Sequence, residues 1–93
     1  MSVYYVYILE TTSKEGITKY YTGYTNNLYK RWSEHRKGVG AKFCRGKKKI
    51  LLKYFETFMD RTEAMKRELE IKSFSRQKKE ELIKNFNNSD KSG

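Results

Sequence analysis

The sequence predicts a single small α+β domain, and three observations lead to that class. Three segments are rich in the β-branched and aromatic residues that are typical of strands. Three others begin near helix-capping residues and continue with helical periodicity. A chain of 93 residues has room for one domain with a modest core. We expect that domain to cover residues 1–86, followed by a disordered tail over residues 87–93.

The first two strands are expected to form a hairpin. Residues 3–10 are apolar at nearly every position, which is typical of a central strand covered on both faces. Turn chemistry around Gly16 then leads into a second strand over residues 19–25. Because side chains alternate between the faces of a strand, two pairs each share a face: Tyr5 with Tyr7, and Tyr21 with Gly23.

The first helix is expected over residues 28–37. Asn27 is a suitable cap before it, and Gly38 is a suitable stop after it. At about 100° per residue, Arg31 and His35 fall together along one border of the apolar stripe. On that edge between core and solvent, Arg31 could bind a phosphate and His35 could transfer a proton, although a lone histidine is more often a packed or surface residue.

The remaining elements follow in order along the chain. A glycine-rich basic loop over residues 38–49 leads into a third strand over residues 50–58. A helix then runs from a cap at Asp60 to about Ser73. A last short helix is expected over residues 75–86.

Glu68 falls inside the apolar arc of the helix that follows Asp60. Helical geometry places it at about 40° from Ala64, within an arc of roughly 160°. The apolar members of this arc are Ala64, Met65, Leu69 and Ile71. A carboxylate on such a stripe must be paired, protonated or bound to a metal. Two interpretations stay open: an ion pair with Lys72 one turn on, and a magnesium site, which needs only one or two protein carboxylates.

Tyr7 and Tyr21 are most simply core aromatics whose hydroxyls reach a wet edge. The ordinary pKa of a tyrosine is about 10, which is too high for a general base near neutrality. A neighbouring cation, such as Arg31 or a metal ion, would have to stabilise the phenolate.

The positive charge of the chain is concentrated in one segment. The formal net charge is +10, and residues 27–53 hold ten basic residues against one acidic residue. Such a localised excess favours a polyanion as partner, because neutralised phosphates release counterions. A solvated basic face is the alternative. Seven residues in or beside the basic loop are the expected nucleic-acid contacts: Lys30, Lys42, Phe43, Arg45, Lys47, Lys48 and Lys49.

Several classes of protein are disfavoured by composition. The single cysteine, Cys44, cannot form an internal disulfide and has no histidine nearby for a zinc site. No apolar run approaches the length of about 18 residues that a membrane span needs, and the N-terminus lacks a charged region and a cleavage pattern. We therefore expect a cytoplasmic protein that does not bind a membrane.

Two short motifs and their spacing carry a family resemblance. "YVY" at residues 5–7 and "YTG" at residues 21–23, followed by "NNLYKRWSEH", resemble the GIY-YIG nuclease superfamily. Arg31 lies ten positions after Tyr21, and His35 lies four further on, as in that family. "AMKRELEIK" resembles the family helix that bears a metal-binding glutamate, which falls on Glu68. The resemblance spans residues 3–83, and the overall form is similar to small stand-alone bacterial members.

The resemblance implies a central three-stranded antiparallel sheet flanked by helices. It also implies an endonuclease that hydrolyses DNA phosphodiester bonds in repair or recombination, with low sequence specificity and one Mg²⁺ or Mn²⁺ at Glu68. Tyr7 or Tyr21 would activate the attacking water, Arg31 would stabilise charge on the phosphoryl oxygens, and His35 would assist proton transfer. Gly23 would allow the close approach of a phosphate.

Other interpretations of the same residues remain open. The basic segment 38–53 could serve a nucleic-acid-binding module that does not catalyse a reaction, with Phe43 stacked on a base. The partner could be branched or single-stranded DNA, or RNA. A protein partner could supply specificity.

Overall fold

The computed structural model describes residues 2–37 and 49–92. The elements, in chain order, are β1 (Tyr4–Thr12), β2 (Thr18–Thr25), α1 (Leu28–Arg36), β3 (Lys49–Phe58), α2 (Arg61–Lys72) and α3 (Arg76–Ser92). This is the predicted order of hairpin, helix, strand, helix and helix.

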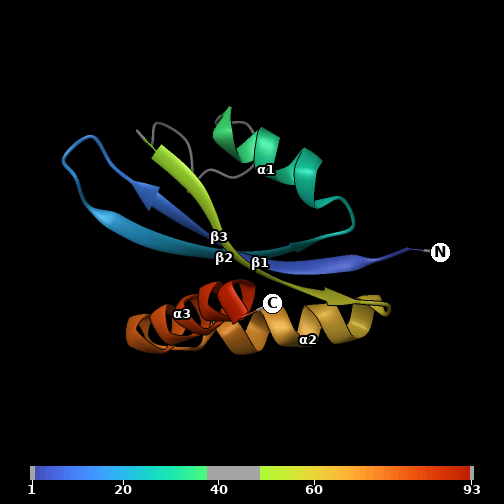
Figure 1. Cartoon of the computed structure of the whole chain (residues 1–93). Coiled ribbons are helices and arrows are strands. Elements are labelled where there is room, and N and C mark those ends of the chain that lie inside the picture. The colour runs from blue at the N-terminus through green and yellow to red at the C-terminus, as the bar shows by residue number, and fades with distance from the viewer. Residues whose placement is uncertain (1, 38–48, 93) are drawn as a thin grey trace.

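The three strands form one antiparallel sheet in the order β2-β1-β3. The predicted central position of β1 is therefore confirmed. Figure 1 shows α1 on one face of the sheet, with α2 and α3 together on the other. The molecule thus has three layers, and the sheet separates α1 from the other two helices.

Alternation along β1 gives each face its own core. Val6 and Ile8 are fully buried and pack with Ala64 and Ile71 in the layer of α2 and α3. The intervening residues of β1 belong to a second cluster on the α1 side, which contains Tyr7, Leu9, Ile50, Tyr21, Leu28, Trp32, Leu52 and Phe55. The near-continuous apolar pattern of residues 3–10 follows from this two-sided burial.

A β-bulge in β3 shifts its register against β1. Ile8 lies opposite Tyr54, whereas Leu9 lies opposite Leu52, so Lys53 is the extra residue. Because of this shift, Leu52 and Phe55 both pack in the cluster on the α1 side, while Tyr54 packs on the opposite face. The bulge decides which aromatic residues of β3 lie near α1.

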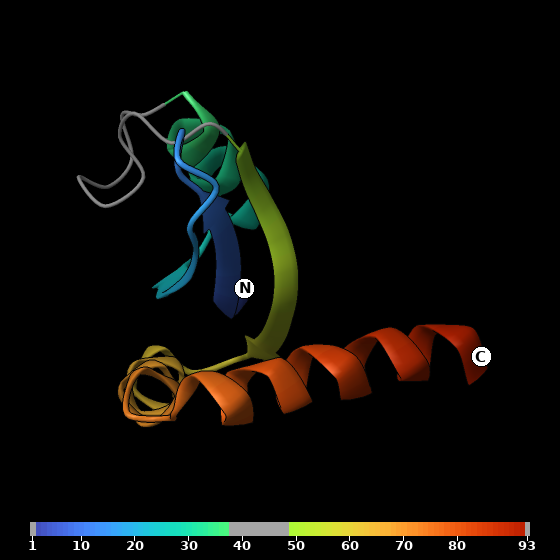
Figure 2. The same ribbon diagram turned by 90° about the vertical axis from the view of Figure 1, so that its left-hand side faces the viewer.

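The last helix is longer than the sequence predicts. The expected helix end at Phe86 is replaced by a helix that continues to Ser92, so residues 87–92 of the expected tail are helical. Residues 87–92 contain neither glycine nor proline, so no strong stop precedes Gly93. Figure 2 shows α3 extending well past the edge of the sheet.

The buried arc of α2 is narrower than the helical wheel predicts. Ala64 and Ile71 are fully buried, but Met65 is 40% exposed and Leu69 is 64% exposed. The sheet covers only the side of the helix that faces it, and a helical wheel does not give the width of that cover. Within residues 2–37 and 49–92, no helix is long and apolar enough to cross a membrane.

Candidate active site

The hydroxyl of Tyr7 lies at the centre of the candidate site. Tyr7 occupies the middle of the central strand and is only 2% exposed. Its hydroxyl oxygen is hydrogen-bonded to Nε2 of His35 on α1, at 3.0 Å. The pair joins residues that are 28 positions apart, so the sheet and α1 must both be in place before it can form.

Gly23 makes room for that hydroxyl. Gly23 is the partner of Tyr7 in the β1–β2 register. A Cβ atom at Gly23 would lie 2.6 Å from the Tyr7 hydroxyl oxygen and 2.8 Å from its Cζ, both closer than real Cβ contacts allow. Within the described residues, the close approach that requires glycine here is therefore to Tyr7.

His35 is completely buried and packs against two tyrosine rings. Its ring centroid lies 5.9 Å from that of Tyr7 and 5.2 Å from that of Tyr21. Burial, and then the positive charge of Arg31, lower the pKa of His35 below its ordinary value. The imidazole is consequently neutral near pH 7. Among the described residues, its Nδ1 atom is buried without a hydrogen-bond partner.

Arg31 brings a permanent positive charge to the same hydroxyl. It lies one helical turn before His35 on α1, as the sequence predicts. Burial alone would lower the pKa of Arg31, but hydrogen bonds with the Tyr7 hydroxyl and the Glu34 carboxylate outweigh it and raise the pKa. Its Nη1 atom lies 3.4 Å from the Glu34 carboxylate. Glu34 thus holds the guanidinium beside the tyrosine.

These contacts give Tyr7 an unusual chemical environment. Its hydroxyl is hydrogen-bonded to a neutral imidazole nitrogen and also interacts with the guanidinium of Arg31. An imidazole can accept the tyrosine proton, and a cation stabilises the resulting phenolate. Tyr21 stands beside them with its ring centroid 6.5 Å from that of Tyr7. Four of the five predicted catalytic residues are therefore gathered on the α1 side of the sheet.

Glu68, the fifth predicted catalytic residue, lies in the other helical layer. Its side chain is 15% exposed, and its carboxylate lies 3.7 Å from Nζ of Lys72. The ion pair that the sequence left open as an alternative is therefore formed. Helix α2 lies across the sheet from α1 (Figure 1).

A divalent metal at Glu68 would have few protein ligands. Among the residues that the structure describes, no group of three His, Cys, Asp or Glu side chains is arranged to hold a metal ion. Mg²⁺ retains several waters and is often held by one or two carboxylates together with substrate phosphate. The hard carboxylate oxygens of Glu68 fit an ion of that kind.

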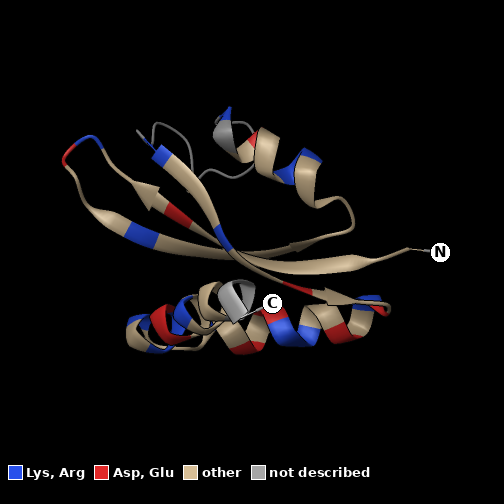
Figure 3. Ribbon diagram, in the orientation of Figure 1, with Lys and Arg blue, Asp and Glu red and all other residues tan. Residues whose placement is uncertain are grey.

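A cationic hollow opens beside the α1 end of this site. It has a volume of about 570 Å³, and its basic lining residues are Lys30, Arg31 and Arg61. Arg61 begins α2, and its Nη2 atom lies 3.5 Å from the Tyr24 hydroxyl. Figure 3 shows basic positions on α1 and at the start of α2. Arg61 lies outside the basic segment of residues 27–53, so the charge pattern of the sequence did not indicate it.

Two of the seven expected nucleic-acid contacts lie among the described residues. Lys30 is exposed and lines the cationic hollow. Lys49 is exposed at the start of β3. The other five predicted contacts, Lys42, Phe43, Arg45, Lys47 and Lys48, lie outside the described residues.

The order of the elements and the Tyr, Arg and His cluster agree with the match of the chain to a family model. The model of the GIY-YIG catalytic domain matches residues 3–81. The chain therefore belongs to the GIY-YIG family, which is a family of nucleases.

Its relatives include proteins of the UPF0213 group. A UPF0213 protein of Haloquadratum walsbyi is 44% identical over 79 residues, which cover 85% of this chain and 84% of the relative. A UPF0213 protein of Clostridium perfringens is 46% identical over 79 residues, with 85% and 81% covered.

A solved structure has the same fold. The solution NMR structure of a UPF0213 protein from Bacillus halodurans is 43% identical to this chain, with a TM-score of 0.52. The match covers 88% of this chain and 83% of that protein. The three-stranded antiparallel sheet flanked by helices is thus confirmed.

Proposed function

We propose that this protein is a metal-dependent endonuclease that hydrolyses phosphodiester bonds of DNA, in repair or recombination as the family resemblance implies. One observation carries the proposal: the Tyr7 hydroxyl is hydrogen-bonded to Nε2 of a neutral His35 and interacts with the charged Arg31. This arrangement suits a tyrosine that acts as a general base.

The proposed proton path runs from water to Tyr7 and then to His35. The Tyr7 hydroxyl donates its proton to Nε2 of His35, and the phenolate accepts a proton from the attacking water. Arg31 stabilises the phenolate and then the charge that develops on the phosphoryl oxygens. Tyr21 is partly exposed beside this pair and orients the water. This assigns the role of base to Tyr7, which the sequence left open between two tyrosines.

Glu68 is the proposed ligand of the metal. By the family resemblance, a Mg²⁺ or Mn²⁺ ion held by Glu68 would supply positive charge at the leaving oxygen, with water and substrate phosphate as further ligands, although α2 carries Glu68 in the layer across the sheet from α1. In the structure, Glu68 is paired with Lys72, whose Nζ lies 3.7 Å from its carboxylate.

The expected specificity follows from the chemistry of the cationic hollow. Lys30, Arg31 and Arg61 are suited to contacts with backbone phosphates. Phosphate contacts position a strand but carry little sequence information. We therefore propose low sequence specificity.

Cleavage assays with a matched pair of variants test this function. Supercoiled plasmid and labelled oligonucleotides are incubated at low salt with Mg²⁺, Mn²⁺ or a chelator. We expect metal-dependent nicking that Glu68→Gln removes and that Glu63→Gln, an exposed carboxylate of the same helix, retains. Metal-dependent cleavage that survives Glu68→Gln would overturn the metal assignment. Tight binding without any product on every substrate would favour the binding module.

A further inference from the structure

A second hollow lies on the other side of the turn that leads into α1. Its volume is about 690 Å³, within the range of small-molecule binding sites. We call it the aromatic groove, defined by Tyr5, Tyr29, Trp32 and Phe55. Tyr29 and Trp32 come from α1, with ring centroids 6.4 Å apart. Tyr5 and Phe55 come from the sheet and form an edge-to-face pair at 6.1 Å.

Tyr29 is unusually exposed for an aromatic residue. Tyr29 is 76% exposed, although an aromatic ring of this size is usually buried on at least one face. Trp32, one turn later, is only partly covered. Helix α1 therefore presents two neighbouring rings to a concave surface that the described residues leave accessible.

The aromatic groove and the cationic hollow adjoin each other. Asn26 and Asn27 line both of them. Asn27 also caps α1 by accepting a hydrogen bond from the Lys30 backbone nitrogen, at 3.1 Å. The first turns of α1 therefore direct Lys30 and Arg31 to one hollow, and Tyr29 and Trp32 to the other.

This pairing of surfaces matches the two sides of a single nucleic-acid strand. A strand carries its phosphates along one side and its bases along the other, and aromatic side chains stack on bases without regard to sequence. In a duplex the bases are paired and stacked inside, so they cannot enter a lateral groove. We propose that the aromatic groove stacks unpaired bases of a strand whose phosphates lie in the cationic hollow.

The substrate class then follows, and it rests on the proposed nuclease function. The scissile phosphate lies near Arg31, and the neighbouring nucleotides are unpaired. Single-stranded segments, flaps and overhangs are substrates of this kind, whereas a blunt duplex is not. The formal net charge of +10 favours such a polyanion over an uncharged apolar peptide as the occupant.

The single tryptophan of the chain provides a direct probe of the groove. Because Trp32 lines it, stacking of a base should quench its fluorescence. The titration uses full-length protein in chelator, so that no cleavage occurs, and oligothymidylate of about 12 nucleotides, within the site sizes common for single strands. An oligomer of equal length with abasic sites keeps the phosphates but lacks the bases. A blunt duplex serves as the second control.

We expect quenching by oligothymidylate, and little or none by the abasic oligomer or the duplex. Tyr29→Ala should weaken oligothymidylate binding about tenfold, which is the loss of one stacking contact. Binding of the duplex should be unchanged. The matched control is Leu69→Ala, which removes another exposed apolar side chain, 64% exposed, from the opposite layer. Equal quenching by the abasic oligomer, or equal affinity of Tyr29→Ala, would overturn the proposal.

Two readouts separate this proposal from the nuclease proposal. If base-dependent quenching occurs but no substrate is cut with metal, the groove is supported and the nuclease function fails. If metal-dependent cleavage is equally fast on blunt duplex and single strand, and Tyr29→Ala changes neither rate, the nuclease stands and the groove proposal fails. An apolar peptide that competes for the groove while oligothymidylate does not would also overturn it.

Discussion

The two faces of the sheet place tyrosine hydroxyls in opposite chemical environments. On the α1 face, Tyr7 meets the imidazole of His35 and the guanidinium of Arg31. On the other face, the Tyr54 hydroxyl donates to the carboxylate of Glu56. A neutral base with a cation favours loss of the tyrosine proton, whereas a carboxylate favours its retention.

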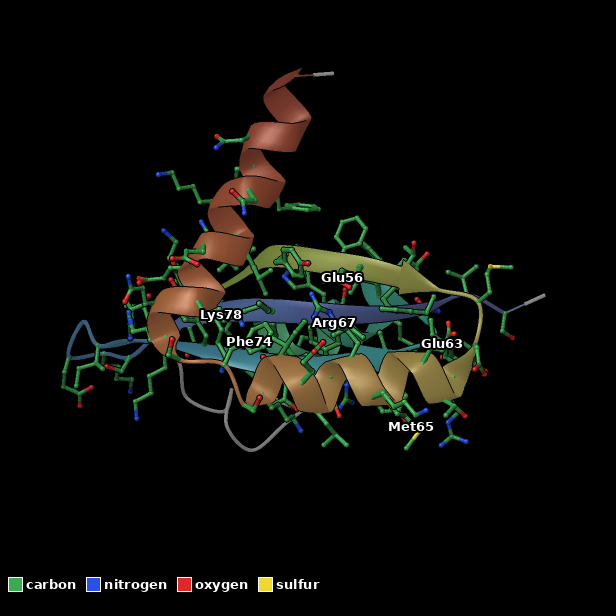
Figure 4. The ribbon with its side chains drawn as sticks, turned by 90° about the horizontal axis from the view of Figure 1, so that it is seen from below. Glu56, Glu63, Met65, Arg67, Phe74 and Lys78 are labelled. Atoms are coloured by element: carbon green, nitrogen blue, oxygen red, sulfur yellow. The ribbon has the colours of Figure 1, made fainter. Side chains whose placement is uncertain are left out.

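On the face covered by α2 and α3, hydrogen bonds and ion pairs join four side chains, which we call the paired cluster: Tyr54, Glu56, Arg67 and Glu70. Arg67 donates from Nε and Nη2 to Glu56, with the Nη2 contact at 2.9 Å, and also pairs with Glu70. Figure 4 shows that Arg67 extends from α2 over the same face of the sheet toward Glu56 on β3. Burial, and then the bond to Glu56, raise the pKa of Tyr54 to about 12. Its proton is therefore fixed over the whole physiological range.

The two faces of the sheet are therefore suited to different roles. The paired cluster joins α2 to β3, and the raised pKa of Tyr54 keeps that hydroxyl protonated. On the α1 face, the lowered pKa of His35 keeps the imidazole neutral, and a buried Nδ1 has no partner among the described residues. The face covered by α2 and α3 is suited to stability, and the face covered by α1 is suited to proton transfer.

The largest expected effect is the contrast between two hydroxyl deletions. Tyr7→Phe should lower the single-turnover cleavage rate by about 10²–10⁴-fold, because it removes the general base and little volume. Tyr54→Phe should leave the rate unchanged. Circular dichroism would confirm that both variants fold. Equal rates for Tyr7→Phe and the unaltered protein would exclude Tyr7 as the base.

A second prediction compares two glycines. Gly23→Ala should destabilise the fold by about 1–3 kcal/mol and slow cleavage, because the new Cβ overlaps the Tyr7 hydroxyl. Gly16→Ala should cost about 1 kcal/mol through its φ of 85°, with no loss of rate, since nothing lies within 4 Å of the added atom. Urea unfolding and cleavage rates measure the two effects. Normal cleavage by Gly23→Ala would contradict the predicted displacement of Tyr7.

The paired cluster should affect stability alone. Glu56→Gln should lower the free energy of unfolding by about 1–2 kcal/mol, because charge-assisted bonds from a partly buried Arg67 are weakened. The cleavage rate of the folded enzyme should stay the same, since the side-chain partners of Glu56 are Tyr54 and Arg67, which have no role in the proposed reaction. A large loss of activity at full stability would show that the two faces are coupled.

The smallest expected effect concerns pH. A histidine with a lowered pKa binds its proton more weakly when folded, so the unfolded state takes up more protons as pH falls below about 6.5. The contribution of His35 to stability is therefore present above that pH and declines below it. His35 is the only histidine, so His35→Gln should flatten the stability profile between about pH 5 and 7. An unchanged slope in the variant would contradict the burial of a neutral imidazole.

The features that depend on neighbours along the chain can be predicted from the amino-acid sequence alone. Strand-forming residues, helix caps and turn residues gave the order of the elements, and helical spacing placed Arg31 and His35 one turn apart. The end of α3 was missed because a helix without a breaker continues until packing or composition stops it.

The contacts between distant segments depend on the tertiary structure. The strand register put Gly23 against the Tyr7 hydroxyl, and the packing of α1 on the sheet brought His35 to it. The exposure of Leu69 and the two adjoining hollows depend likewise on which surfaces the sheet covers. Local patterns act over a few residues, whereas these contacts follow from how strands and helices pack in space.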